Sequence, residues 1–241
     1  MRLEKRNSVA FEGWEYILRE SYQKLDEDYR DFLENDQNYF PSKENYFNAF
    51  KTLPKDDVKY ILFGQDPYPR EESAIGYAFI DAKVKSIFGE TGLSKEVNRA
   101  TSLRNFIKMA LVARGDLRND DTSPQTIERI DKSGLIASID ELKENFEKNG
   151  VLLLNTALIF TDKKSSASHI KSWAPFIEHL LFSLVEVSPK LILFGNHAKD
   201  LKKKFDLSKF ETIEMEHPYN HTFISNDNAL KLFGNMKLLE K

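Results

Sequence analysis

The chain has 241 residues, is 41% hydrophobic and carries a formal net charge of −3. This length and composition predict one domain with a sizeable core over residues 1–241, in which residues 1–50 form a helical extension packed on the rest. The absence of cysteine excludes disulfides, thiol nucleophiles and cysteine-held metal clusters. No stretch approaches the roughly 20 apolar residues of a membrane span, and the N-terminus lacks a signal-peptide core, so we expect a cytoplasmic protein.

Helical and strand patterns alternate along the chain. A helix is expected over residues 12–34 and a buried strand over 58–62. Another helix is expected over 102–114, with Thr101 or Ser102 as its cap. The later expected elements are a helix over 139–148, strands over 151–155, 190–195 and 211–216, and helices over 173–187, after 196–197 and over 228–239. This alternation predicts a single-domain, three-layer α/β/α fold around a central, mostly parallel four-stranded sheet.

Polar side chains follow the predicted strands at the points where the strands end. They include Asp66, Asn155 and His217. Because the carboxyl ends of parallel strands share one edge of a sheet, these side chains can line one crevice. A carboxylate, an amide and an imidazole, with aromatic rings nearby, suit a nucleobase or a similar planar ring, which an amide can read and a ring can stack against. A metal site is disfavoured, since no His, Asp or Glu cluster has the spacing of metal ligands.

The segment after the first predicted strand, residues 63–72 (Phe-Gly-Gln-Asp-Pro-Tyr-Pro-Arg-Glu-Glu), ends that strand abruptly. Prolines at 67 and 69 fix the local backbone, so Asp66 and Tyr68 are expected on a stiffened loop. An Asp-Pro pair alone would indicate no more than a turn, but the whole string is far more specific.

Five segments carry a resemblance to a known family. Residues 64–68 (Gly-Gln-Asp-Pro-Tyr) resemble the water-activating motif of uracil-DNA glycosylases of the UNG type, family 1. Residues 76–79 are similar to the family's base-stacking segment, and residues 102–105 to a DNA-contacting segment. Residues 150–156 are similar to the uracil-reading strand, and residues 217–218 to the catalytic histidine loop. The resemblance covers roughly residues 55–240 and identifies the chain as a divergent member. It implies a DNA repair enzyme that releases uracil and leaves an abasic site.

The resemblance assigns catalytic roles to two residues. Asp66 would orient the attacking water and stabilise the positive charge that develops on the sugar. His217 would donate a hydrogen bond to uracil O2 as negative charge builds on the leaving base. A lone histidine before proline is more often structural. The catalytic assignment of His217 therefore depends on its position directly after the fourth predicted strand.

Four more residues would form the base pocket by the same resemblance. Asn155 would pair with the uracil edge, and Phe79 would stack on the base. Tyr68 would occupy the space that a thymine methyl group needs, and Gln65 would contribute through its backbone. The residues expected to contact DNA are Ser102, Arg104, Tyr219, His221, Thr222 and Phe223.

The chain departs from the family pattern where the family grips DNA. Pro69 stands where the motif normally has a histidine linked to positioning the carboxylate, and Asp81 stands near an expected serine. In the histidine loop His221 replaces the leucine wedge by direct register, with Phe223 as the alternative wedge. The base pocket therefore resembles the family more closely than the DNA grip does. We expect the chemistry to be retained, and single-stranded DNA or an unusual genome context to suit the protein better than ordinary duplex.

Other functions stay open on the sequence alone. The glycosylase could excise another modified pyrimidine, or the fold could bind DNA or protein without turnover. A small nucleotide-binding α/β protein is a third alternative, although the sequence has no P-loop and no Gly-x-Gly-x-x-Gly motif. The proposed chemistry requires no metal or organic cofactor. The expected partners are uracil-containing DNA and proteinaceous glycosylase inhibitors, and the expected state is a monomer.

Overall fold

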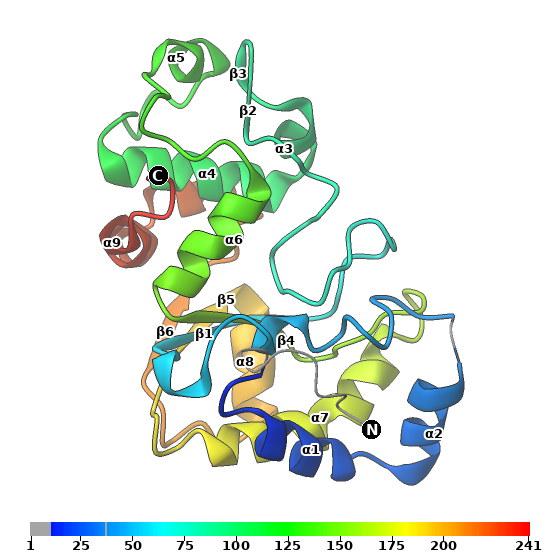
Figure 1. The fold of residues 1–241 in the computed structure, drawn as a ribbon. Helices are drawn as coiled ribbons and strands as arrows, with labels where there is room; N and C mark the ends of the chain where they lie inside the picture. The colour runs from blue at the N-terminus through cyan, green and yellow to red at the C-terminus, as the bar shows by residue number, and fades with distance from the viewer. Residues whose placement is uncertain (1–10, 37) are drawn as a thin grey trace. The chain divides into compact units, whose positions relative to one another are not determined.

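The computed structural model describes residues 11–36 and 38–241, so the start of the predicted N-terminal extension lies outside the described residues. Its main sheet has four strands in the order β4-β1-β5-β6 (Figure 1). These strands are β1 (Tyr60–Gly64), β4 (Val151–Asn155), β5 (Lys190–Phe194) and β6 (Thr212–Met215). β1 pairs in parallel with both β4 and β5, which confirms the predicted parallel sheet.

The centre of the sheet is apolar because β1 and β4 are buried. Ile61, Leu62 and Phe63 of β1 are buried, and so is every residue of β4. Continuous apolar runs of this kind are typical of parallel strands covered by helices. β6 is more exposed, as its alternating sequence predicts. The register pairs Gly64 with Asn155, so the ends of β1 and β4 lie side by side.

The helices follow the predicted order with three corrections. The expected helix over 12–34 is two helices, because Asp26 caps the second one by accepting a hydrogen bond from the Asp28 amide at 3.1 Å. The helix after residue 100 has Ala100 at its N-cap, so neither Thr101 nor Ser102 caps it. The helix expected from 173 begins at Ser166 and contains Pro175 in its interior. The α-helices are α1 (Glu15–Gln23), α2 (Glu27–Asn35), α3 (Lys95–Arg99), α4 (Thr101–Arg114), α5 (Pro124–Arg129), α6 (Ile139–Lys148), α7 (Ser166–Ser183), α8 (Gly195–Lys204) and α9 (Asp227–Met236).

Short elements that the sequence patterns did not predict complete the fold. They are the short helices α3 and α5, the hairpin strands β2 (Phe88–Gly89) and β3 (Gly92–Leu93), and the 3-10 turns η1 (Asn48–Phe50), η2 (Lys55–Asp57) and η3 (His221–Ser225). Elements of two to six residues are too short to show a hydrophobic period. The α6 helix, by contrast, has its predicted bounds because Ser138 and Glu141 form a capping box at its start.

The chain divides into two compact units. The first unit contains the chain up to Ile80, Gly150–Ile192 and Asp200–Thr212, and the second contains Asp81–Asn149, Leu193–Lys199 and Ile213–Lys241. That residues 1–241 act as one domain stays a prediction.

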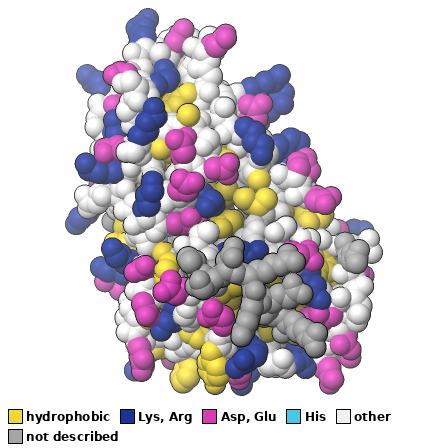
Figure 2. Space-filling model, viewed as in Figure 1, with side chains coloured by type: hydrophobic (Ala, Val, Ile, Leu, Met, Phe, Trp, Pro, Cys, Tyr) yellow, Lys and Arg dark blue, Asp and Glu magenta, His cyan; other side chains and the backbone are white. Residues whose placement is uncertain are grey.

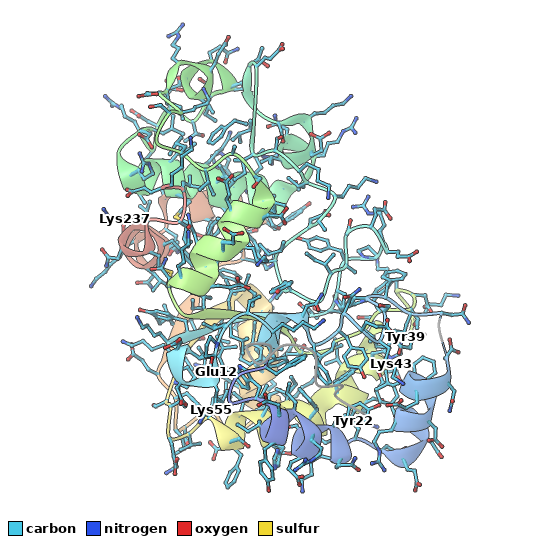
Figure 3. The ribbon with its side chains drawn as sticks, viewed as in Figure 1. Glu12, Tyr22, Tyr39, Lys43, Lys55 and Lys237 are labelled. Carbon is cyan, nitrogen blue, oxygen red and sulfur yellow. The ribbon has the colours of Figure 1, made fainter. Side chains whose placement is uncertain are left out.

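In the first unit, the N-terminal helices are an integral part of the packing. α1 lies beside α7, and the Trp14 indole donates to the Leu53 carbonyl at 2.8 Å (Figure 1). Tyr22 of α1 donates to Glu34 of α2 at 3.0 Å, and Lys43 forms an ion pair with the same carboxylate. Tyr22 and Lys43 are labelled in Figure 3. The described part of the predicted extension therefore packs on α7 within the first unit.

In the second unit, α4 packs against α9 and η3. The rings of Phe106, Phe146 and Phe233 form its aromatic core, with the Phe106 and Phe233 centroids 4.8 Å apart. This core supports the segment that follows β6, which carries the predicted histidine loop.

The surface carries charge of both signs. On the face shown in Figure 2, lysine and arginine side chains are interspersed with aspartate and glutamate. The lysines at 202–204 are exposed at the end of α8, as a solvated helix face would be. Over residues 11–36 and 38–241, every helix is too short or too polar to cross a bilayer.

Candidate active site

Five predicted site residues lie in the first unit at or after the ends of β1 and β4. We call Gln65, Asp66, Tyr68, Phe79 and Asn155 the strand-end site. The backbone that leads to Asp66 is tied to the end of β4. The Thr156 amide donates to the Gly64 carbonyl at 3.0 Å, and the Thr156 hydroxyl donates to the Gln65 carbonyl at 2.8 Å. The two strand ends thus form one rigid edge, as expected for neighbouring parallel strands.

Asn155 is the last residue of β4, and its side chain is held close to β1. A Cβ on Gly64 would lie 2.2 Å from the Asn155 Oδ1 atom, so only glycine at 64 leaves room for this amide. Asn155 is 6% exposed, yet the hydrogen bonds among the described residues leave its side-chain amide unpaired. Buried polar groups normally have partners. An unpaired amide in this position is therefore suited to a ligand that can both donate and accept.

Asp66 is partly buried and is contacted from α7. The Ser166 hydroxyl, at the first residue of that helix, donates a hydrogen bond to the Asp66 Oδ2 atom. Ser166 itself is 9% exposed. Ser166 is not recognisable as a site residue from the sequence, because it lies 100 residues from Asp66 and its surroundings have the composition of a polar loop.

The aromatic pair of the strand-end site is locked by a hydrogen bond. The Tyr68 hydroxyl donates to the Phe79 carbonyl at 3.2 Å. Phe79 has φ of 68°, a left-handed conformation that is strained for a bulky side chain. Strain of this kind concentrates at functional sites, where the surrounding structure holds it in place. The structure therefore brings Tyr68 and Phe79 together, as a base pocket requires.

His169 is a structural residue of the same unit. Its Nδ1 atom lies 2.8 Å from the Tyr29 hydroxyl and its Nε2 atom 2.9 Å from the Thr161 hydroxyl. Burial lowers the pKa of His169, against the opposing effect of the Asp162 and Asp66 charges. Both ring nitrogens therefore have hydrogen-bond partners, and these bonds hold the first turns of α7, where Ser166 lies, in place. The N-terminal helices contribute here through Tyr29, which the sequence analysis did not anticipate.

The predicted histidine loop, residues 217–223, lies in the second unit after β6. The Tyr219 amide donates to the His217 Nδ1 atom at 3.0 Å. A neutral imidazole that accepts at Nδ1 carries its proton on Nε2, so His217 presents a donor. Desolvation of the ring lowers the pKa of His217 below the ordinary value of a histidine, although the residue as a whole is exposed. Gly195 allows the close approach of this loop, since a Cβ there would lie 3.1 Å from the His217 Cβ.

Asn105 of α4 holds the histidine loop in place. Its side-chain nitrogen donates to the carbonyls of Pro218 at 2.8 Å, Tyr219 at 3.3 Å and Asn220 at 3.3 Å. Asn105 is 2% exposed. The sequence placed Asn105 inside a DNA-contacting segment, but its role is to fix the backbone of a loop more than 100 residues away.

Replacing Asn105 with leucine is expected to reduce catalysis and stability together. The buried carbonyls would lose their donor, which costs about 1–3 kcal/mol of unfolding free energy, and the loop that carries His217 would lose its anchor. Asn145→Leu is the matched control, because Asn145 donates to the Leu238 and Glu240 carbonyls at 3.0 and 2.7 Å. Both variants should unfold at lower temperature, but only Asn105→Leu should slow the reaction at temperatures where both are folded. Equal activity of the two folded variants would contradict the anchoring role.

The residues expected to contact DNA differ in their availability. Tyr219 is 67% exposed and His221 is also exposed, so both could meet a ligand. The Thr222 hydroxyl donates to Glu216. Phe223 is fully buried, with its ring centroid 5.8 Å from Phe194, so its prediction as an alternative wedge is corrected. It reads as a loop residue in sequence but belongs to η3 and the aromatic core.

The remaining DNA-contact candidates lie at the start of α4. Ser102 and Arg104 are partly exposed, and the Arg104 guanidinium donates to the Asn98 carbonyl at 2.8 Å. Asp81, which departs from the family pattern, is 5% exposed and caps the Lys83 amide at 3.0 Å. The Asp81 carboxylate therefore has a structural function within its own loop.

Comparison with known proteins gives consistent results. A family model for the uracil DNA glycosylase superfamily matches residues 50–232. A uracil-DNA glycosylase from Fusobacterium nucleatum is 29% identical over 216 residues, covering 85% of this chain and 80% of that protein. The crystal structure of the wild-type UNG from Nitratifractor salsuginis is 52% identical with a TM-score of 0.94, covering 97% of this chain and 94% of that chain. A mimivirus uracil-DNA glycosylase is similar in fold, with a TM-score of 0.54 at 21% identity, covering 85% of this chain and 66% of that chain.

Proposed function

The chain belongs to the uracil-DNA glycosylase superfamily, and from this premise we propose that the strand-end site and the histidine loop together excise uracil from DNA. The observation that carries this proposal is the edge formed by β1 and β4. It holds the Asp66 carboxylate and the unpaired Asn155 amide on adjacent strand ends. The target base must leave the stack to reach any such pocket.

In the proposed reaction, a water oxygen bonds to C1′ of the deoxyribose while the bond from C1′ to uracil N1 breaks. The bonding electrons leave with the base. Asp66 orients the water, and its negative charge stabilises the cation-like sugar. The proton released by the water is taken up at the carboxylate, and the base leaves as its N1 anion. Exchange with solvent then protonates the anion to free uracil and removes the proton from Asp66, leaving an abasic site.

Recognition of uracil is assigned to three residues of the strand-end site. The Asn155 amide accepts from N3–H and donates to O4, a pattern that matches uracil and not cytosine when the amide orientation is fixed. Phe79 stacks on the base. The bond from Tyr68 to the Phe79 carbonyl supports a fixed tyrosine ring, which excludes a methyl group at C5 by collision.

His217 is assigned to the leaving base. Its Nε2–H donates to uracil O2, where negative charge gathers as the bond breaks. The bond from the Tyr219 amide to Nδ1 supports this role, because it selects the tautomer with the proton on Nε2.

The acid limb of the pH profile is expected to report on His217. Because its pKa lies below the ordinary value of about 6.5, His217 is neutral at pH 7 and stays neutral until the pH falls to that lowered pKa. Protonation at Nδ1 then removes the acceptor for the Tyr219 amide and disorganises the loop. The excision rate should stay level from pH 8 to below 6.5 and fall at lower pH. His217→Gln should be slower and should lack this limb; an identical limb in that variant would assign it to another group.

The direct test is release of free uracil from single-stranded and duplex oligonucleotides that contain one uracil. Oligonucleotides with thymine or a C5-modified pyrimidine in its place serve as controls. Uracil released from the uracil oligonucleotides alone supports the proposed function. Release of another pyrimidine alone would favour a glycosylase of different specificity, and DNA binding without release by folded protein would favour a binding protein.

We also propose a preference for single-stranded DNA. With Phe223 buried, the exposed part of the histidine loop offers Tyr219 and His221 in place of an aliphatic wedge. A faster reaction on duplex than on single-stranded uracil DNA would count against this preference. Monomeric state and cytoplasmic location are retained as predictions. A mimivirus UNG has been crystallised with UGI, so inhibition by UGI is a direct test of the predicted proteinaceous inhibitor partners.

A further inference from the structure

One hydrogen bond joins Asp66 to the first turn of α7. The Ser166 hydroxyl donates to Asp66 Oδ2, and both residues lie in the first unit. Ser166 begins α7 and is 9% exposed, so its hydroxyl is held by the helix and shielded from water. Hydrogen bonds from a neutral donor to a charged acceptor are among the stronger ones in proteins.

The loop that carries Asp66 offers little to orient the carboxylate by itself. Pro67 and Pro69 flank Tyr68, and a proline has neither a backbone N–H nor a polar side chain. The carboxylate can still rotate about its χ2 bond, which is broad in energy. A donor from outside the loop can select one rotation, and Ser166 occupies that place.

Contacts of the neighbouring residues His169 and Ser165 fix the position of Ser166. His169, one turn further along α7, is held by Tyr29 on one ring nitrogen and by Thr161 on the other. Ser165 precedes Ser166 and donates to Asp162 Oδ2 at 2.9 Å, which closes the turn that leads into the helix. These contacts leave the first turn of α7 little freedom to move away from Asp66.

We infer that Ser166 is a positioning residue for catalysis: its hydroxyl sets the orientation of the Asp66 carboxylate toward the attacking water. This inference rests on the proposed function of Asp66. Ser166 does not touch the substrate in this account and acts only through Asp66.

The test is a double-mutant cycle on excision of uracil from a single-stranded oligonucleotide. Ser166→Ala should lower kcat about 10- to 100-fold, as expected for loss of a hydrogen bond to a charged group, with KM for DNA little changed. In an Asp66→Ala background there is no carboxylate to orient, so the same Ser166→Ala change should have an effect of about twofold or less. Ser166→Thr keeps the hydroxyl and should restore most of the rate.

Ser133→Ala is the matched control, because it removes a hydroxyl-to-carboxylate bond, from Ser133 to Asp131 Oδ2 at 3.0 Å, that involves neither Asp66 nor α7. It should keep the wild-type rate, and thermal unfolding should show all variants folded at the assay temperature. Wild-type kcat in Ser166→Ala would overturn the inference, and so would an equal loss in both backgrounds. Wild-type protein that releases no uracil would overturn the proposed function, and the inference with it. An active wild type with an unaffected Ser166→Ala variant would overturn the inference alone.

Discussion

Asp66→Asn is expected to lower the rate of uracil excision by about three orders of magnitude. Asparagine has nearly the same shape as aspartate, so the loop between Pro67 and the end of β1 should keep its structure. The substitution removes the negative charge that stabilises the cation-like sugar and the group that accepts the proton of water. The measurement is the single-turnover rate on a single-stranded uracil oligonucleotide, with long incubation times for the slow variant.

The matched control for this experiment is Asp131→Asn. Asp131 is an exposed carboxylate in the second unit that caps the Ser133 amide at 2.9 Å, outside both parts of the proposed site. It should excise uracil at the wild-type rate. DNA binding by Asp66→Asn should also be retained, since the change lowers the charge repulsion with phosphate. An Asp66→Asn rate within about tenfold of the wild type would remove Asp66 from the catalytic role assigned to it.

Gly64→Ala is expected to reduce uracil excision by roughly 100-fold without touching a catalytic residue. The new Cβ would lie 2.2 Å from the Asn155 Oδ1 atom and 3.0 Å from the Ala78 Cβ, so the amide must move. The backbone of Gly64 is outside the left-handed region, so the cost of alanine comes from this contact and not from backbone strain. A displacement of about 1 Å in a group that positions the substrate is enough for a loss of this size.

This prediction separates uracil recognition from the chemical step. Free uracil should inhibit Gly64→Ala less strongly than the wild type, because the displaced amide no longer matches the uracil edge. Gly134→Ala is the control, since a Cβ at residue 134 meets nothing within 4 Å and its backbone is also outside the left-handed region. If Gly64→Ala retained the wild-type rate and the wild-type inhibition by uracil, then the Asn155 amide would not be the group that reads the base.

Among the elements, those with strong local signals were predicted most accurately. β4 and α6 have the bounds expected from the sequence, because β4 is a continuous apolar run and α6 starts at a capping box. The helix over 12–34 was wrong as one element, since Asp26 interrupts it with a cap that the hydrophobic period does not reveal. The start of α7 was also missed, because its first turns are rich in serine and its interior contains Pro175.

The sequence alone predicts the order of the four main-sheet strands along the chain and the polar residues that follow three of them, and its resemblance to the family points to Asp66, Asn155 and His217. These features are local, because an apolar run followed by a turn motif can be recognised within a single segment of the sequence. The contacts of Ser166 and Asn105, and the burial of Phe223, are visible only in the tertiary structure. Each of these depends on side chains that lie far apart in the chain and meet only when helices pack on the sheet and on one another. No local pattern encodes which hydroxyl will meet a carboxylate 100 residues away.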